Sequence, residues 1–151
     1  MLIVFDIDGT LADLTHRLHH IKGEGPKDWD AFFAATRFDK TIPEMITLCI
    51  NLIEIGNDVI FASGRNEICR ADTILWLSQH AQLSTGYIDR MLYMRSEGDR
   101  RPDYLVKHDI LVKIMTDWGQ KPDIVFDDRQ QVVDMWRDEG IRCCQVAPGN
   151  F

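Results

Sequence analysis

Two aspartates near the N-terminus form the first group of residues that could do chemistry. Asp6 and Asp8 directly follow the apolar run 2–5, and Gly9 permits a sharp turn after them. In an extended chain, side chains two residues apart project to the same side, so the two carboxylates face the same way. Neighbouring carboxylates ionise together only at high cost unless a cation is close. The pattern favours a catalytic or metal-binding pair; the alternative is a surface turn at Asp8 with Asp6 as a cap.

Further polar side chains follow other apolar runs along the chain. Four carboxylates supply the oxygen ligands that Mg²⁺ prefers, and no zinc-like set of cysteines and histidines competes: Asp6, Asp8, Asp127 and Asp128. Hydroxyl and cationic groups suited to an oxyanion accompany them: Thr10, Ser63, Arg65 and Lys107. A carboxylate can attack phosphorus only when a metal and a cation offset the repulsion between the two anions. The combination therefore indicates phosphoryl transfer.

These residues need a scaffold that brings them together, and the sequence predicts a parallel sheet. Short apolar runs predict strands at 2–5, 59–62, 91–94, 124–126 and 141–146. Helical patterns lie between them, at 67–80, 103–118 and 130–139. Such alternation is typical of a doubly wound α/β fold with right-handed crossovers. Because parallel strands share one carboxyl edge, Asp6, Ser63 and Asp127 are expected to meet there.

A further helix, after residue 40, has boundary signals of its own. Thr41 and Glu44 form a capping-box pattern, and Pro43 falls in the first turn. Gly56 is a suitable C-cap. We therefore expect the helix to run between Thr41 and Gly56.

Residues 13–40 are the least regular part of the chain and contain the helix breakers Gly23, Gly25 and Pro26. We interpret them as a small lid, with one or two short helices, over the end of the first strand. Its aromatic residues either stack on a base or form the lid's own core: Trp29, Phe32 and Phe33. Its clustered histidines are expected to contact solvent or substrate rather than a metal: His16, His19 and His20.

Three further polar residues have two interpretations each. Arg17 in the lid and Arg65 after the second strand could each reach a substrate phosphate, or form ion pairs elsewhere. Asp103 is either a functional acid or the N-cap of the helix at 103–118.

The composition indicates one soluble globular domain across residues 1–151. Hydrophobic residues make up 45% of the chain, and the net charge of −7 argues against a broad basic face for nucleic acid, although not against a local basic pocket. No signal peptide or membrane span is expected, so the predicted location is cytoplasmic. The cysteines are predicted to be buried, reduced thiols: Cys49, Cys69, Cys143 and Cys144.

Four pieces in chain order resemble the motifs of the haloacid dehalogenase (HAD) superfamily: DIDGT at 6–10, Ser63 after a strand, Lys107 on a helix, and the pair Asp127-Asp128. The resemblance implies a HAD-like Rossmannoid fold, a doubly wound parallel sheet with a small lid segment. It also implies a Mg²⁺-dependent phosphatase that works through an aspartyl-phosphate. An aspartate at position 8, rather than an aliphatic residue, favours phosphate chemistry over dehalogenation.

The same resemblance implies roles for individual residues. Asp6 is the expected nucleophile and Asp8 the general acid/base, while Lys107 stabilises the phosphate. Mg²⁺ is expected on Asp6, on the Asp8 main-chain carbonyl and on Asp127, with Asp128 supporting the metal shell or Lys107. The expected substrate contacts are Thr10, Arg17, Ser63, Gly64 and Arg65.

Longer stretches are similar to the 3′-phosphatase domain of the T-even phage polynucleotide kinase/phosphatase family: FDIDGTLA, ASGR, GDRRPDYLVK and FDDRQQVVDMWRDEGIRCCQVAPGNF. The kinase signature GxxxxGK[ST] does not occur, so we expect a phosphatase without 5′-kinase activity, with a possible separate kinase or ligase. The leading substrate is a 3′-phosphorylated nucleic-acid end. The alternatives are free nucleoside monophosphates as substrates, and a non-enzymatic module that binds phosphorylated ends. The sequence leaves the oligomeric state open.

Overall fold

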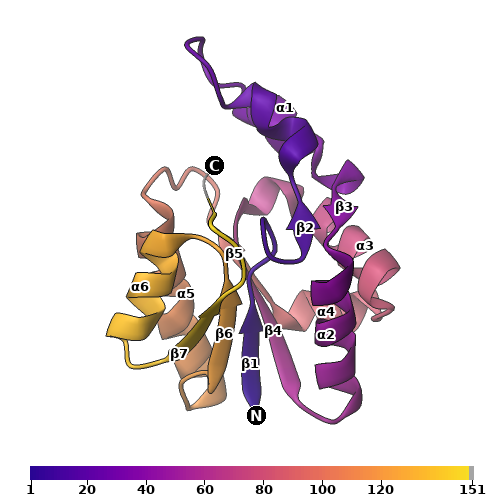
Figure 1. The fold of residues 1–151 in the computed structure, drawn as a ribbon, viewed down its shortest axis with the longest axis vertical. Coiled ribbons are helices and arrows are strands. Elements are labelled where there is room, and N and C mark those ends of the chain that lie inside the picture. The colour runs from indigo at the N-terminus through magenta and orange to yellow at the C-terminus, as the bar shows by residue number, and fades with distance from the viewer. Residues whose placement is uncertain (150–151) are drawn as a thin grey trace.

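A five-stranded parallel sheet forms the centre of the structure (Figure 1). In the computed structural model, which describes residues 1–149, the strand order is β5-β4-β1-β6-β7. The strands are β1 (Leu2–Phe5), β4 (Asp58–Asn66), β5 (Leu92–Arg95), β6 (Ile124–Asp127) and β7 (Arg142–Gln145). Every neighbouring pair in this sheet is parallel. The predicted α/β class with a parallel sheet is therefore confirmed.

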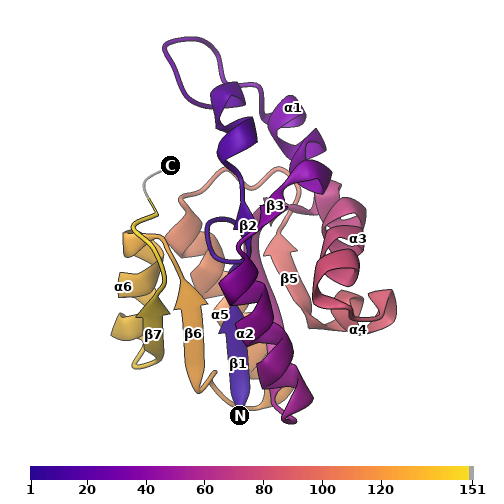
Figure 2. The same ribbon diagram turned by 45° about the vertical axis from the view of Figure 1, so that its right-hand side comes forward.

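Helices cover both faces of the sheet, as Figures 1 and 2 show. One face packs against α2 (Pro43–Glu54), α3 (Arg70–Ala81) and α4 (Thr85–Met91), and the other against α5 (Asp103–Trp118) and α6 (Gln130–Asp138). Residues of β1 alternate between the two cores: Leu2 and Val4 belong to one, and Ile3 and Phe5 to the other. A strand buried on both faces explains why this segment shows no polar alternation.

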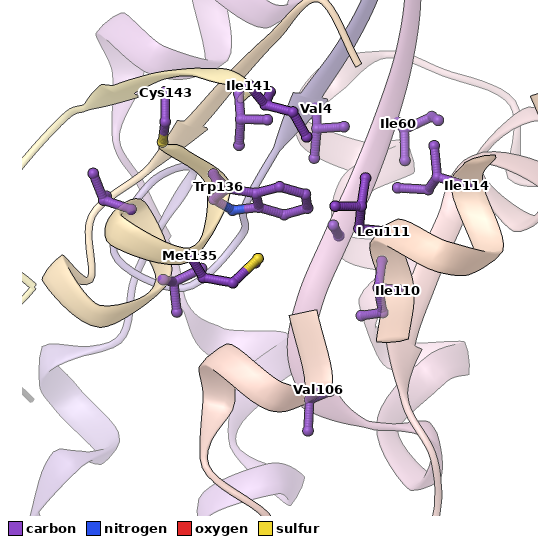
Figure 3. Close-up of a cluster of buried hydrophobic side chains, with 14 of the residues drawn as sticks. Val4, Ile60, Val106, Ile110, Leu111, Ile114, Met135, Trp136, Ile141 and Cys143 are labelled. Carbon is purple, nitrogen blue, oxygen red and sulfur yellow. The ribbon is translucent and has the colours of Figure 1, made fainter. Parts of the chain in front are cut away.

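The core beside α5 and α6 also supports the carboxyl edge of the sheet. Figure 3 shows the Trp136 ring in this core, whose other residues include Val4, Leu111 and Ile141. The Trp136 side chain is fully buried, and its indole N–H donates to Asp127 Oδ2 at 3.4 Å. Burial of this large ring, whose truncation to alanine costs about 3–5 kcal/mol in typical cores, thus also fixes a carboxylate at the end of β6.

A small lid projects from the carboxyl edge between β1 and α2 (Figure 2). Its stem is a two-stranded antiparallel pair, β2 (Ala12–Asp13) with β3 (Lys40–Thr41). Between these strands lie a 3₁₀ turn at Thr15–His20, the helix α1 (Trp29–Ala34) and a second 3₁₀ turn at Thr36–Phe38. Asp28 caps α1 by accepting a hydrogen bond from the Ala31 N–H at 2.9 Å.

Several predicted boundaries were wrong. Thr41 pairs with Ala12 in the lid stem, so it does not cap α2; the N-cap is Ile42, which makes no side-chain capping bond. The strand expected to end before Ser63 continues to Asn66, with a register shift in its last residues. The helix expected from 67 begins with a 3₁₀ turn, Glu67–Cys69, before α3.

Two further predictions need correction. Met91, where the strand 91–94 was expected to begin, is instead the last residue of a short helix, α4, and Ser84 caps this helix by accepting a hydrogen bond from the Tyr87 N–H. The sheet resumes only at Leu92. Cys49, Cys69 and Cys143 are buried free thiols as predicted, but Cys144 is exposed. Within residues 1–149, no helix has both the length and the apolar character required to cross a membrane.

Candidate active site

Three carboxylates meet at the carboxyl edge of the sheet. Asp6 follows β1, Asp127 ends β6 and Asp128 comes next, and each has an oxygen within 4.8 Å of the others. The backbone N–H of Asp6 donates to the carbonyl of Phe126 at 2.9 Å, which holds the two strand ends in register. All three side chains are buried, with exposed fractions of 5% or less. The parallel sheet thus places together residues about 120 positions apart in the sequence.

Lys107 joins this group from α5. Its Nζ donates to Asp6 Oδ1 at 2.5 Å, to the Ala62 carbonyl at 2.6 Å and to Asp127 Oδ2 at 3.2 Å. Burial disfavours the charged amine, but Asp127 and Asp6 outweigh burial and raise the pKa of Lys107. Lys107 is therefore a fixed cation beside the carboxylates, with three acceptors for its three N–H donors.

The buried carboxylates fit a divalent cation. Burial raises the pKa of Asp6, with Asp127 and Asp128 adding to the rise and Lys107 opposing it. Burial, together with Asp127, raises the pKa of Asp128 to about 7. Asp128 Oδ1 is buried without a hydrogen-bond partner among residues 1–149. A set of oxygen donors with one unpaired oxygen, where ionisation is costly without added positive charge, matches Mg²⁺ rather than zinc.

Asp8 lies apart from the three carboxylates and is held by two arginines. Its Oδ1 accepts from Arg17 Nη2 at 2.7 Å and from Arg65 Nη2 and Nε at 2.6 and 3.0 Å. Burial disfavours the charged carboxylate, but Arg65 and Arg17 outweigh burial and lower the pKa of Asp8. Both arginine side chains are fully buried, so neither forms a surface ion pair.

Asp39, which the sequence interpretation did not single out, completes this network. Its carboxylate is fully buried and accepts from Arg17 Nε and Nη2 at 2.7 and 2.8 Å, and from Arg65 Nη2 at 2.6 Å. His16 Nε2 lies 2.8 Å from Asp39 Oδ1. Two arginines thus face two aspartates, so the formal charges of Arg17, Arg65, Asp8 and Asp39 balance. Spacing alone gave no signal for Asp39, because it lies in the irregular lid segment.

The hydroxyl residues lie at the same edge of the sheet. Ser63 is fully buried, and its Oγ accepts from the Arg65 N–H at 3.2 Å. Thr10 is also fully buried, and its Oγ1 has no hydrogen-bond partner within the described part of the chain. A buried hydroxyl without a partner is costly unless a ligand supplies one, so Thr10 is suited to an oxyanion.

Gly64 and Asp103 are in direct contact. A Cβ on Gly64 would lie 2.2 Å from Asp103 Oδ1, so no larger residue fits without displacing that carboxylate. Asp103 is paired with Arg95 at 2.8 Å and with Arg129 at 3.4 Å. Of the two interpretations of Asp103, the N-cap is wrong: Pro102 occupies the cap position, and Asp103 is the first residue of α5. Arg95 and Arg129 were not singled out from the sequence either.

An open cavity of about 740 Å³ connects the carboxylates with the lid. Asp6, Asp8, Asp127 and Asp128 line its floor, while aromatic residues of α1 and arginines of the segment 95–101 line its sides. Phe32 is buried, with the Arg17 guanidinium 4.2 Å from its ring centroid, whereas Trp29 is 46% exposed. Among the lid histidines, His16 contacts Asp39, and the His19 and His20 rings contact each other.

Comparison with known proteins identifies relatives of the whole chain. Residues 1–151 match the family model for the polynucleotide kinase PNKP phosphatase domain. A protein of Autographa californica nuclear polyhedrosis virus, named as a candidate bifunctional polynucleotide kinase/RNA ligase, is 31% identical over 141 residues. That alignment covers 90% of this chain and 18% of the viral protein.

Solved structures share the fold. A chain of the Pnkp1/Rnl/Hen1 complex is 28% identical with a TM-score of 0.75, covering 99% of this chain and 46% of that one. The class C acid phosphatase from Bacillus anthracis, at 15% identity and a TM-score of 0.68, shares the fold over 99% of this chain and 67% of its own. The present chain thus spans less than half of the viral relative and of the complex chain. The chain belongs to the family of polynucleotide kinase PNKP phosphatase domains, which are phosphatases of the HAD superfamily.

Proposed function

We propose that this phosphatase is a Mg²⁺-dependent phosphomonoesterase that removes 3′-phosphates from polynucleotide ends through an aspartyl-phosphate. The observation that carries the proposal is the buried position of Asp6 at the floor of the cavity, between Lys107 and two further carboxylates. Membership of the polynucleotide phosphatase family supports the substrate class.

Asp6, Asp127 and Asp128 are the residues that would hold Mg²⁺. The bound ion would neutralise charge on the phosphate oxygens and keep Asp6 ionised. Lys107 contributes a second positive charge from α5, in direct contact with Asp6. Thr10, whose hydroxyl has no partner among residues 1–149, supplies a hydrogen bond to a phosphate oxygen. Ser63, whose Oγ lies 3.2 Å from the Arg65 backbone nitrogen, supplies a second hydrogen bond, and Arg65 adds positive charge.

In the first step, a carboxylate oxygen of Asp6 attacks phosphorus, and the bond from phosphorus to the 3′-oxygen breaks. Asp8 gives its proton to the leaving oxygen, which departs as a hydroxyl. Arg17 and Arg65 hold the Asp8 carboxyl in place. These arginines lower the pKa of Asp8 in the free protein, whereas an anionic phosphate beside them offsets their charge and favours the protonated acid that this step needs.

In the second step, a water molecule gives a proton to Asp8 and attacks phosphorus. The bond from phosphorus to the Asp6 oxygen breaks, which releases inorganic phosphate and restores both carboxyl groups to their starting state. The lowered pKa of Asp8 suits it to hold an ionised carboxylate in the intermediate, ready to accept this proton.

Free nucleoside monophosphates remain the second candidate substrate, because the cavity of about 740 Å³ also accommodates a single nucleotide. The intact set of nucleophile, acid/base and cation argues against a module that only binds phosphorylated ends. We extend the proposal to the partners: a separate ligase uses the 3′-hydroxyl that this phosphatase exposes, or a separate kinase phosphorylates the 5′ end to be joined to it, in a cytoplasmic setting.

Phosphate release tests the proposal. The purified protein with Mg²⁺ is incubated with a 3′-phosphorylated oligonucleotide, with matched 5′-phosphorylated oligonucleotide, and with 3′- and 5′-nucleoside monophosphates. Asp6→Asn removes the nucleophile, and Asp134→Asn, at an exposed position on α6, is the matched control. We expect the 3′-phosphorylated oligonucleotide to react fastest, with activity lost in Asp6→Asn and retained in Asp134→Asn. Faster release from the monomers would make nucleoside monophosphates, rather than polynucleotide ends, the substrate class. Activity in Asp6→Asn would reject the mechanism.

A further inference from the structure

The cavity above the carboxylates has two unlike walls. From Asp6 and Asp8 it opens outward between the lid helix α1 and the segment 95–101, which begins at the last residue of β5 and leads toward α5. Figures 1 and 2 show α1 and this connecting segment on the same side of the sheet, at the carboxyl ends of the strands. The volume of about 740 Å³ exceeds what a phosphate group alone requires, so the walls have room to contact more of the substrate.

Trp29 is the most exposed of the three aromatic rings on the lid wall. Phe32 is 5% exposed and packs on Arg17, so little of its ring is available to a ligand. Trp29 is 46% exposed and is supported from within the lid by Phe33, whose ring is stacked at 27° with centroids 6.0 Å apart. The amine of Lys27 lies 5.5 Å from the Trp29 ring centroid. A half-exposed indole with an adjacent cation is suited to a nucleobase and its phosphate.

The opposite wall contains arginines, of which most already have a carboxylate partner. Arg95 pairs with Asp103, and Arg101 pairs with Asp99 and Asp109. Arg100 is exposed on the same wall and makes no ion pair or hydrogen bond with any residue in 1–149. It is therefore an arginine of this wall with its guanidinium available for a ligand anion.

We propose that the outer part of this cavity, the groove between α1 and the segment 95–101, binds the last two nucleotides of a strand. A base stacks on Trp29, and the internucleotide phosphate pairs with Arg100. The inference rests on the proposed function, since it places the terminal phosphate at Asp6. A free mononucleotide lacks an internucleotide phosphate, so Arg100 acts only on strands, whereas Trp29 acts on both substrates. Arg100 thereby determines specificity for polynucleotides over monomers.

The kinetic test compares two substrates that share the scissile ester and the base: 3′-phosphorylated tetrathymidylate and thymidine 3′-monophosphate. Arg100→Gln is expected to raise KM for the tetranucleotide, relative to KM for the monomer, roughly two- to fivefold, because the contact is exposed. It should also reduce the slope of log kcat/KM against log salt by about 0.7 for the tetranucleotide. Trp29→Ala should raise KM for both substrates, roughly 5- to 150-fold, through lost stacking.

Matched controls come from the remainder of the chain. Arg142→Gln removes the same charge from the exposed start of β7, and Phe38→Ala removes an exposed lid aromatic that does not line the cavity. The proposal would be overturned if Arg100→Gln and Arg142→Gln changed the ratio of the two KM values equally and changed the slope of log kcat/KM against log salt equally. An unchanged KM in Trp29→Ala would overturn the stacking assignment.

Direct binding separates this inference from the proposed function. Fluorescence anisotropy measures a 5′-labelled, 3′-phosphorylated tetrathymidylate on Asp6→Asn, with and without Arg100→Gln or Trp29→Ala. If the wild type releases no phosphate but binding still depends on Arg100 and Trp29, the proposed function fails and the groove stands. If phosphate is released but binding is indifferent to both substitutions, the function stands and the groove is rejected.

Discussion

The buried carboxylate of Asp39 allows a quantitative prediction about stability. It accepts hydrogen bonds from Arg17 and Arg65 and is fully buried. Asn at this position keeps the shape but removes the negative charge, and its NH₂ group is a donor, as the guanidiniums are. Asp39→Asn therefore leaves two buried arginines facing a single remaining carboxylate, that of Asp8.

The size of the effect follows from the burial of the network. Removing one partner of a buried ion pair costs about 3–5 kcal/mol, because the other charge is left uncompensated. Asp8 still pairs with both arginines, so we expect the lower end of this range, about 3 kcal/mol. For a domain of this size each kcal/mol lowers Tm by about 2–4 °C, which gives a fall of roughly 6–12 °C.

Urea unfolding followed by circular dichroism measures this loss, and calorimetry gives the change in Tm. Asp72→Asn is the matched control, because Asp72 also pairs with an arginine, Arg37, but at the surface. The control is expected to lose less than about 1 kcal/mol. A loss in Asp39→Asn no larger than that in Asp72→Asn would refute the reasoning, since burial of the network would then carry no net stabilisation.

Four further predictions concern the metal, Gly64 in β4 and the thiols. Mg²⁺ at 100 times its Kd should stabilise the wild type by about 2.7 kcal/mol in urea unfolding, and Asp127→Asn should lose most of this gain. Gly64→Ala should cost about 1–3 kcal/mol in the same assay and reduce phosphate release, because its Cβ would overlap Asp103. Burial raises the pKa of Cys49 to about 12, while the unfolded thiol ionises near 8.5, so this thiol favours the folded state below about pH 8.5 and loses that contribution as pH rises toward 12. Cys49 should therefore contribute about 1 kcal/mol to the stability that urea unfolding shows to be lost between pH 7.5 and pH 9.5, and Cys49→Ala should reduce that loss by this amount. Iodoacetamide should alkylate Cys144 first in the native protein, and mass spectrometry that finds Cys49 modified equally fast would contradict its burial.

Much of the sheet could be predicted because its signals are local. Short apolar runs identify the strands, and the carboxyl-edge rule then brings Asp6, Ser63 and Asp127 together without any knowledge of the packing. The structure places these residues at that edge, with Lys107 in contact with two of its carboxylates. The periodicity of α5 likewise suffices to direct Lys107 toward the sheet.

The remainder depends on contacts that no local pattern contains. Asp39 acquires its role from two arginines 22 and 26 positions away, so its place in the irregular lid gave no hint of burial. Thr41 satisfies a capping pattern, but pairing with Ala12 competes with that role and prevails. Residues of α4 are too few for helical periodicity to be distinguished from strand alternation, and the Ser84 cap decides the outcome.

The two-stranded stem of the lid has a consequence for how such phosphatases diversify. Because Ala12 and Asp13 pair with Thr41 and Lys40, the lid leaves and re-enters the domain at adjacent points. Its length and composition can change with little effect on the sheet, as in any insertion whose ends lie side by side. However, the excised unit would carry Arg17, which donates to Asp8, the proposed acid/base, and Asp39, which accepts from Arg17. If the proposed function holds, exchanging one lid for another replaces groups that hold the proposed acid/base together with the proposed substrate-binding surface, so chemistry and specificity would be inherited together.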